Sequence, residues 1–178
     1  MSVSNLNNLI NQSGLSANYV SGVTDFDVFV ATTTGFNGSS GVGGVDAGPP
    51  ADFDFTFSQT IKTDRIALWN QGGIASLVSF TLFGSLAGDF SYEIEIGTFT
   101  NSNFNNSLAN VFTFTEVDIT AIRVRATSNQ GFMFGTRFDE FAIGGTLTNP
   151  ATTPEPTTFL GLLLVGGFGL LSKQQKHN

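Results

Sequence analysis

Strict alternation of apolar and polar residues marks the middle of this chain. From Ala51 to Ser58 (ADFDFTFS), every odd position is Ala or Phe and every even one is Asp, Thr or Ser. Successive side chains of a β-strand point to opposite faces, so this period of two predicts a half-buried strand with its phenylalanines toward the core. The stretch 119–127 (ITAIRVRAT) alternates in the same way, with Arg123 and Arg125 on the outward face.

Further strands are predicted where apolar residues alternate or cluster between turn residues. These are 25–30, 61–70, 77–83, 92–96, 111–115 and 138–143. No convincing helical period precedes the C-terminal end. About eight short strands separated by Gly-, Asn- and Ser-rich turns predict an all-β fold, an antiparallel β-sandwich or jelly roll.

The C-terminal end has a different character. Pro154-Glu155-Pro156 is followed by an uncharged, mostly apolar run to Leu171 and then by Lys173 and Lys176. These three features, in this order, resemble the PEP-CTERM sorting signal of Gram-negative bacteria and cyanobacteria. The resemblance implies a transmembrane helix over 159–171, a basic tail over 172–178, and recognition by an exosortase in the inner membrane. The alternative is a C-terminal helix buried in the domain, but a helix that is apolar all round suits lipid better.

These patterns divide the chain into a β-sandwich over 22–147, a Pro-rich linker over 148–158 that carries the motif, and the membrane helix with its tail. The segment 1–21 precedes the sandwich. An exported protein starts with a basic and then an apolar stretch, and 1–21 has neither. We interpret this as a missing signal peptide, explained either by a start codon assigned too late, which we favour, or by loss of the signal.

Composition excludes several classes of function. The chain has a net charge of −7 and no cysteine, so nucleic-acid binding, disulfides and thiolate metal sites are not expected. Its one histidine, His177, lies in the tail, which leaves no Ser-His-Asp triad for the domain. Paired acids, which general acid–base catalysis would need, occur as Glu93 with Glu95 and as Asp139 with Glu140. Glu93 and Glu95 alternate on a strand and are expected to face water, and no motif combines either pair with a cleft. The sequence therefore predicts a protein that is not an enzyme, with a hydrolase as the least favoured reading.

The body of the chain carries a second resemblance. The stretches 66–70 (IALWN), 122–131 (IRVRATSNQG) and 138–143 (FDEFAI) are similar to motifs of the discoidin-like, galactose-binding-type jelly rolls. The resemblance implies ligand binding through loops at one end of the sandwich, with carbohydrates, lipid head groups or proteins as ligands. It also implies a structural Ca²⁺ ion, which many members of the family hold near these loops.

Candidate ligand-binding residues combine aromatic rings for stacking on a sugar with polar groups that orient it. They are Phe36, Trp69, Asn70, Asn129 and Phe132. For Trp69 the alternative is a place in the core. Arg123 and Arg125 are candidates for acidic polysaccharides, the alternative being cross-strand pairing with Glu93, Glu95 or Asp139.

Oxygen-bearing side chains suggest a Ca²⁺ site, because this ion takes six to eight oxygen ligands. Asp25, Asp27 and Asp46 flank a long Gly/Ser loop, and Glu140 corresponds to the acid of the family's closing motif. The alternative is that these acids are simply solvated.

Together these features predict an exported binding protein of the cell surface or extracellular matrix, with polysaccharide as its expected partner. A structural matrix protein without a small ligand is the rival reading.

Overall fold

The computed structural model describes residues 3–4, 10, 12, 15–20, 23–35, 43–45, 48–70, 73–86, 90–102 and 108–148. The chain divides into two compact units, Met1–Thr148 and Asn149–Asn178, and every described residue belongs to the first. The sorting motif, the expected membrane helix and the basic tail therefore lie outside the described residues. Within the described part, no helix is long and apolar enough to cross a membrane.

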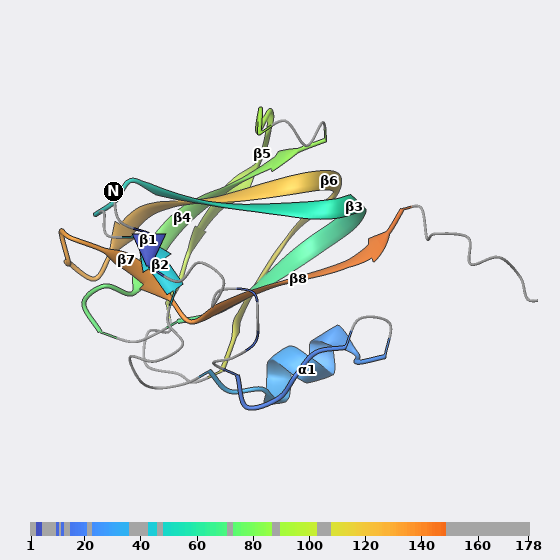
Figure 1. The fold of residues 1–178 in the computed structure, drawn as a ribbon, viewed down its shortest axis with the longest axis horizontal. Helices are drawn as coiled ribbons and strands as arrows, with labels where there is room; N and C mark the ends of the chain where they lie inside the picture. The colour runs from blue at the N-terminus through green and yellow to red at the C-terminus, as the bar shows by residue number, and fades with distance from the viewer. Residues whose placement is uncertain are drawn as a thin grey trace, which may run out of the picture. The chain divides into compact units, whose positions relative to one another are not determined.

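Two long strands organise the fold. β3 (Ala51–Trp69) and β6 (Asn110–Asn129) run antiparallel and side by side, from Ala51 opposite Ala126 to Leu68 opposite Asn110 (Figure 1). β4 (Leu77–Ser85), β5 (Ile94–Thr100) and β8 (Glu140–Leu147) flank them in the order β5-β4-β6-β3-β8. β4 pairs with the second half of β6, whereas β8 pairs with the second half of β3.

Both long strands therefore take part in two layers. One layer contains β4, β5, the first half of β3 and the second half of β6. The other layer contains β8, the second half of β3 and the first half of β6. Aromatic contacts join the layers: Phe55 stacks on Phe141 at 4.6 Å between ring centroids, and Phe80 meets Phe112 edge-on at 5.0 Å. The predicted antiparallel β-sandwich is confirmed.

The register explains why the predicted strands were shorter than the real ones. The stretches 51–58 and 61–70 belong to one strand, as do 111–115 and 119–127. A register irregularity between Thr56 and Ile61 takes the place of a turn, so the strand changes layer without ending. The last predicted strand is divided instead, into β7 (Thr136–Phe138) and β8. β7 forms a small antiparallel sheet with β1 (Val3–Ser4) and β2 (Gly43–Val45).

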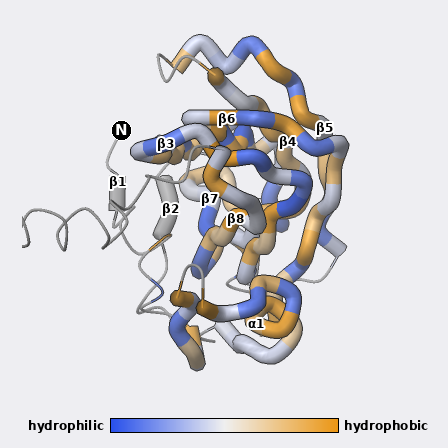
Figure 2. The backbone as a smooth tube through the Cα atoms, turned by 90° about the vertical axis from the view of Figure 1, so that its right-hand side faces the viewer, coloured by the Kyte–Doolittle hydropathy of each residue, from blue (hydrophilic) through white to orange (hydrophobic). Residues whose placement is uncertain are grey.

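The strand expected over 25–30 is wrong, because this segment forms helix α1 (Phe26–Thr32). Asp25 caps it by accepting a hydrogen bond from the backbone N–H of Val28, as N-cap aspartates do. Helical spacing brings Phe26, Phe29 and Val30 to one side of the helix. They pack over Ala67 and Trp69 in a second hydrophobic cluster, and Figure 2 shows α1 beside the strands.

Candidate functional site

Trp69 and Asn70 are buried at the end of β3. The Trp69 side chain is 1% exposed, and its indole N–H donates to the carbonyl of Thr33 at 2.9 Å. The Asn70 amide donates to the carbonyl of Leu77 at 3.0 Å. Neither side chain offers a face to a sugar ring. Trp69 therefore takes the core position named as the alternative to sugar stacking, because α1 covers the indole.

Arg123 and Arg125 lie on the outer face of β6 and are paired across the strand. Arg123 binds Asp54 through Nε (2.7 Å) and Nη2 (2.8 Å), and Arg125 binds Asp52 through the same two atoms (2.8 and 3.0 Å). The hydrogen bond from Arg125 lowers the pKa of Asp52 below its usual value. Cross-strand pairing was the expected alternative, but its partners are Asp52 and Asp54 instead of Glu93, Glu95 or Asp139.

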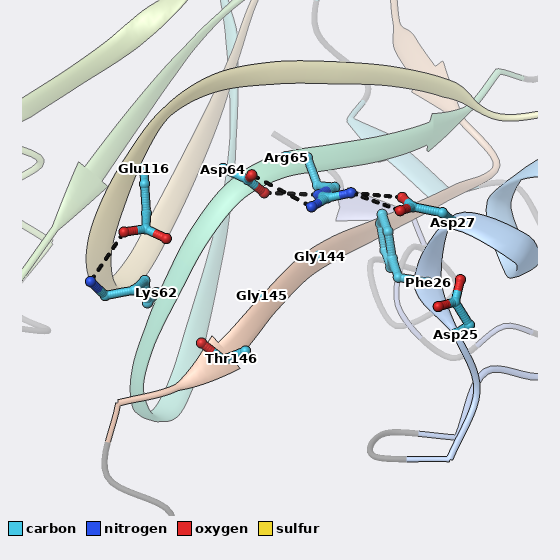
Figure 3. Close-up of a pocket in the computed structure, with 10 residues that line it drawn as sticks. All are labelled: Asp25, Phe26, Asp27, Lys62, Asp64, Arg65, Glu116, Gly144, Gly145 and Thr146. Carbon is cyan, nitrogen blue, oxygen red and sulfur yellow. Dashed lines mark hydrogen bonds and ion pairs between the residues drawn. The ribbon is translucent and has the colours of Figure 1, made fainter.

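The acids around α1 are also engaged. A cleft of about 310 Å³ lies between α1 and the strands. Figure 3 shows Arg65 between Asp64 and Asp27, and Lys62 beside Glu116. Asp27 accepts from Arg65 Nη1 at 2.7 Å and 3.0 Å, while Asp25 caps the helix. The charges lining this cleft therefore satisfy one another.

Three of the four acids of the expected metal site, Asp25, Asp27 and Glu140, lie in the described part of the chain. The described residues contain no group of three or more acidic or histidine side chains placed to hold a metal ion, so these three acids do not converge. Asp46 and the candidate sugar-stacking residue Phe36 lie outside the described residues.

Glu140 and its neighbour Asp139 are buried, at 1% and 3% exposure. Glu140 Oε1 accepts from the backbone N–H of Gln12 at 2.9 Å, whereas Glu140 Oε2 and Asp139 Oδ1 have no partner among the described residues. Burial raises the pKa of both carboxyls to about 7. Two buried oxygens without partners fit carboxyls that hold a proton, whereas a Ca²⁺ ion, which takes six to eight oxygens, would need further ligands beside these two.

Asn129 organises the turn at the end of β6. Its amide donates to the carbonyls of Phe132 (2.6 Å) and Gly135 (2.7 Å), and its carbonyl accepts from the N–H groups of Gly131 and Phe132. Gly131 has φ of +109°, which a side chain would disfavour. Asn129 thus supports the turn and has little hydrogen-bonding capacity left for a ligand.

This turn and the chain after β3 form a surface that we call the loop tip, defined as Ile74, Phe132, Met133 and Phe134. The backbone N–H of Phe132 donates to the carbonyl of Ile74 at 3.1 Å, and that of Gln130 donates to Ser76 at 3.1 Å. The loop tip nevertheless faces solvent: Ile74 is 62% exposed, Met133 72% and Phe134 68%. Phe132 is half-buried, with its ring 6.0 Å from that of Phe134.

Gly48 packs directly against the backbone of the loop tip. A Cβ at this position would lie 2.4 Å from the carbonyl oxygen of Met133, so the two backbone segments touch. The hydrogen bonds of Asn129 and of the backbone, together with this close contact, fix the turn from which Met133 and Phe134 extend into solvent beside Ile74. Such an arrangement is typical of an interaction surface, because folding alone gains little from exposed apolar groups.

The sequence pointed to Phe132 but missed Phe134, Met133 and Ile74. The signal was the run GFMFG at 131–135, an aromatic pair between two glycines. Which of the two rings faces water depends on the turn that Asn129 builds, and this is not visible in the sequence pattern.

The domain is similar in fold to solved structures that include a carbohydrate-binding module. The CBM32 module of AlyQ, solved in complex with 4,5-unsaturated mannuronic acid, has a TM-score of 0.50 at 14% identity, over 58% of this chain and 76% of that one. A fragment from Bacteroides thetaiotaomicron, provisionally named a chitobiase, has a TM-score of 0.51 at 12% identity, over 61% of this chain and 71% of that one. No family model and no curated protein matches the sequence. The galactose-binding-type jelly roll expected from the strand motifs is therefore supported at the level of the fold.

Proposed function

We propose that this chain is an exported, non-enzymatic carbohydrate-binding protein that contacts glycans through the loop tip. The observation that carries the proposal is the exposure of Phe134 and Met133 on a hydrogen-bonded turn. A sugar ring presents an apolar C–H face, and an exposed aromatic ring with apolar neighbours is a surface on which that face packs. The loop tip lies at one end of the strands, where binding loops of a sandwich gather.

A glycan array followed by polysaccharide pull-down with the full chain tests this proposal. Phe134→Ala is expected to weaken binding at least tenfold. Phe90→Ala is the matched control, because Phe90 is also an exposed phenylalanine (53%) but lies beyond the opposite end of β4, before β5. Equal binding by both variants would exclude the loop tip. Absence of binding to any polysaccharide by the folded protein would favour the structural matrix role.

A Ca²⁺ ion held by Asp139 and Glu140 is the second part of the proposal. The support is their burial together with the two oxygens that lack partners in the described part of the chain. The ion would replace the buried proton and would stiffen the junction between β7 and β8. Calorimetric titration with Ca²⁺ is expected to show one site that Glu140→Gln removes and that Asp27→Asn leaves intact.

The C-terminal segment supports the proposed route to the cell surface. Its Pro154-Glu155-Pro156 motif, apolar run and lysines make it a substrate for an exosortase at the inner membrane. Changing the motif to Ala-Ala-Ala is expected to retain the protein in the membrane fraction of an exosortase-bearing host. Unchanged release of this variant would argue against sorting through the motif.

A further inference from the structure

The two halves of β3 differ in how they are paired. The second half lies between β6 and β8, from Ile61 to Trp69. The pairing with β8 stops where the N–H of Thr148 donates to the carbonyl of Thr60 at 3.2 Å. From Ala51 to Gln59, β3 has a strand on one side only among the described residues. We call this stretch the β3 edge.

An edge of this kind usually carries features that prevent pairing with another chain, such as lysine, proline or a bulge. The β3 edge (ADFDFTFSQ) has no lysine or proline. Its register with β6 is regular from Ala51 to Thr56. Its two carboxylates, Asp52 and Asp54, are neutralised by the arginines of β6. The irregularity of the register with β6 begins only after Thr56, so the regular part of the strand, from Ala51 to Thr56, is competent to pair.

An apolar slot of about 370 Å³ lies along the β3 edge. Phe55, Phe57, Phe141 and Ile143 line it, together with Ile10, which is 57% exposed. The slot opens between the two layers of the sandwich, because Phe55 comes from one layer and Phe141 from the other. A second chain that adds a strand here gains both backbone hydrogen bonds and apolar burial.

We propose that the β3 edge pairs with the β3 edge of a second copy of this chain, antiparallel about a twofold axis. Centred on Phe55, the pairing places Phe53 opposite the partner's Phe57. On the solvent face it places Asp54 opposite the partner's Thr56, and Asp52 opposite the partner's Ser58. Phe55 thus meets its own copy beside the slot, and no carboxylate faces another across the axis. Phe53 is 1% exposed and packs on Phe138 at 4.9 Å between ring centroids, so it contributes its backbone and not its ring.

Adjacent registers are less favourable. Moving the centre to Asp54 sets two carboxylates opposite each other, and moving it to Thr56 sets Phe53 opposite the partner's Gln59. A twofold axis at Phe55 also brings the two apolar slots face to face, so each copy covers the other's exposed surface. Such a closed, self-complementary contact is the commonest form of homodimer.

Two substitutions at Thr56 test this proposal, because the residue is exposed and faces the partner's Asp54 in the expected register. Thr56→Asp places like charges together and is expected to weaken the dimer at least tenfold. Thr56→Lys places opposite charges together and is expected to keep or tighten it. General damage to the strand would weaken both, and circular dichroism checks that both variants fold.

The measurement is sedimentation velocity of the full chain in detergent over a range of concentrations. Hydrogen exchange of the same samples is expected to show concentration-dependent protection of the amides of 51–59. A monomer at all concentrations would overturn the proposal. So would association with equal strength in both variants, or constant protection of 51–59, which would indicate that the chain covers the edge itself.

Discussion

Glu140 lies opposite Trp69 in the β3–β8 ladder, and each side chain is 1% exposed. The Glu140 carboxyl is thus enclosed beside an indole. Phe26 and Phe29 of α1 line the same cavity as Glu140. Among the described residues, the backbone N–H of Gln12 is the one donor to this carboxyl, and it bonds Oε1. The energetic consequence is that the free energy of unfolding depends on pH.

Stability is expected to fall as pH rises in the presence of chelator. Burial raises the pKa of Asp139 from 3.8 and that of Glu140 from 4.5, both to about 7. Between these values the folded state binds more protons than the unfolded state, so stability decreases with pH through that window. We expect the free energy of unfolding to drop by about 2–4 kcal/mol from pH 5 to pH 8, measured by urea unfolding. Asp139→Asn should flatten this profile.

Adding Ca²⁺ is expected to restore stability at pH 8 and to have little effect at pH 5, because protons and the cation compete for the same oxygens. Thermal melts with Ca²⁺ and with Mg²⁺ check this expectation. A Ca²⁺ effect that survives in Glu140→Gln would place the ion elsewhere.

Substitution of Trp69 is expected to lower the stability of the domain and not to remove a direct contact with the ligand. Trp69→Ala removes the centre of the cluster beneath α1 and should cost about 3–5 kcal/mol. Trp69→Phe leaves the carbonyl of Thr33 without its donor and should cost about 1–3 kcal/mol. Because Trp69 is the chain's one tryptophan, circular dichroism must follow the unfolding. Lost glycan binding with unchanged stability would instead assign Trp69 to the ligand site.

Gly48→Ala is expected to displace the loop tip, since its Cβ would meet the Met133 carbonyl oxygen at 2.4 Å. Glycan binding should weaken, and hydrogen exchange of 131–135 should accelerate. Gly145→Ala is the matched control, with a similar clash against the Lys62 carbonyl at 2.5 Å but on β8, near the end of the described chain. If both variants weaken glycan binding equally, the effect reflects general destabilisation.

The pair of Asp52 and Arg125 is expected to contribute little to stability despite its two hydrogen bonds. The side chains are 33% and 40% exposed, and exposed pairs typically couple by about 0.2–1 kcal/mol. A double-mutant cycle with Asp52→Ala and Arg125→Ala should give a value in this range, smaller in 1 M salt. Because the pKa of Asp52 is lowered, the contribution should persist at neutral pH and disappear as the pH falls below about 3.8.

Several features of the fold could be predicted from local pattern. The alternation over 51–58 and 119–127 assigned the strands and their faces correctly: Phe53, Ile122 and Val124 are buried, whereas Asp52 and Asp54 are exposed. The period of two is a property of neighbouring residues, so it survives in any sandwich built from these strands. The same pattern gave a wrong prediction at 25–30. There the apolar residues form one side of helix α1, which packs on Trp69.

The sequence by itself therefore determined the all-β class and the inward and outward faces of its main strands, because both follow from alternation within a few residues. Only the tertiary structure decided the partners of Arg125, the burial of Trp69 and Glu140, and the exposure of Phe134. These depend on contacts between distant positions: Asp52 and Arg125 are 73 residues apart, and Gln12 and Glu140 are 128 apart. No local pattern carries that information, since it arises when two layers and a helix pack together.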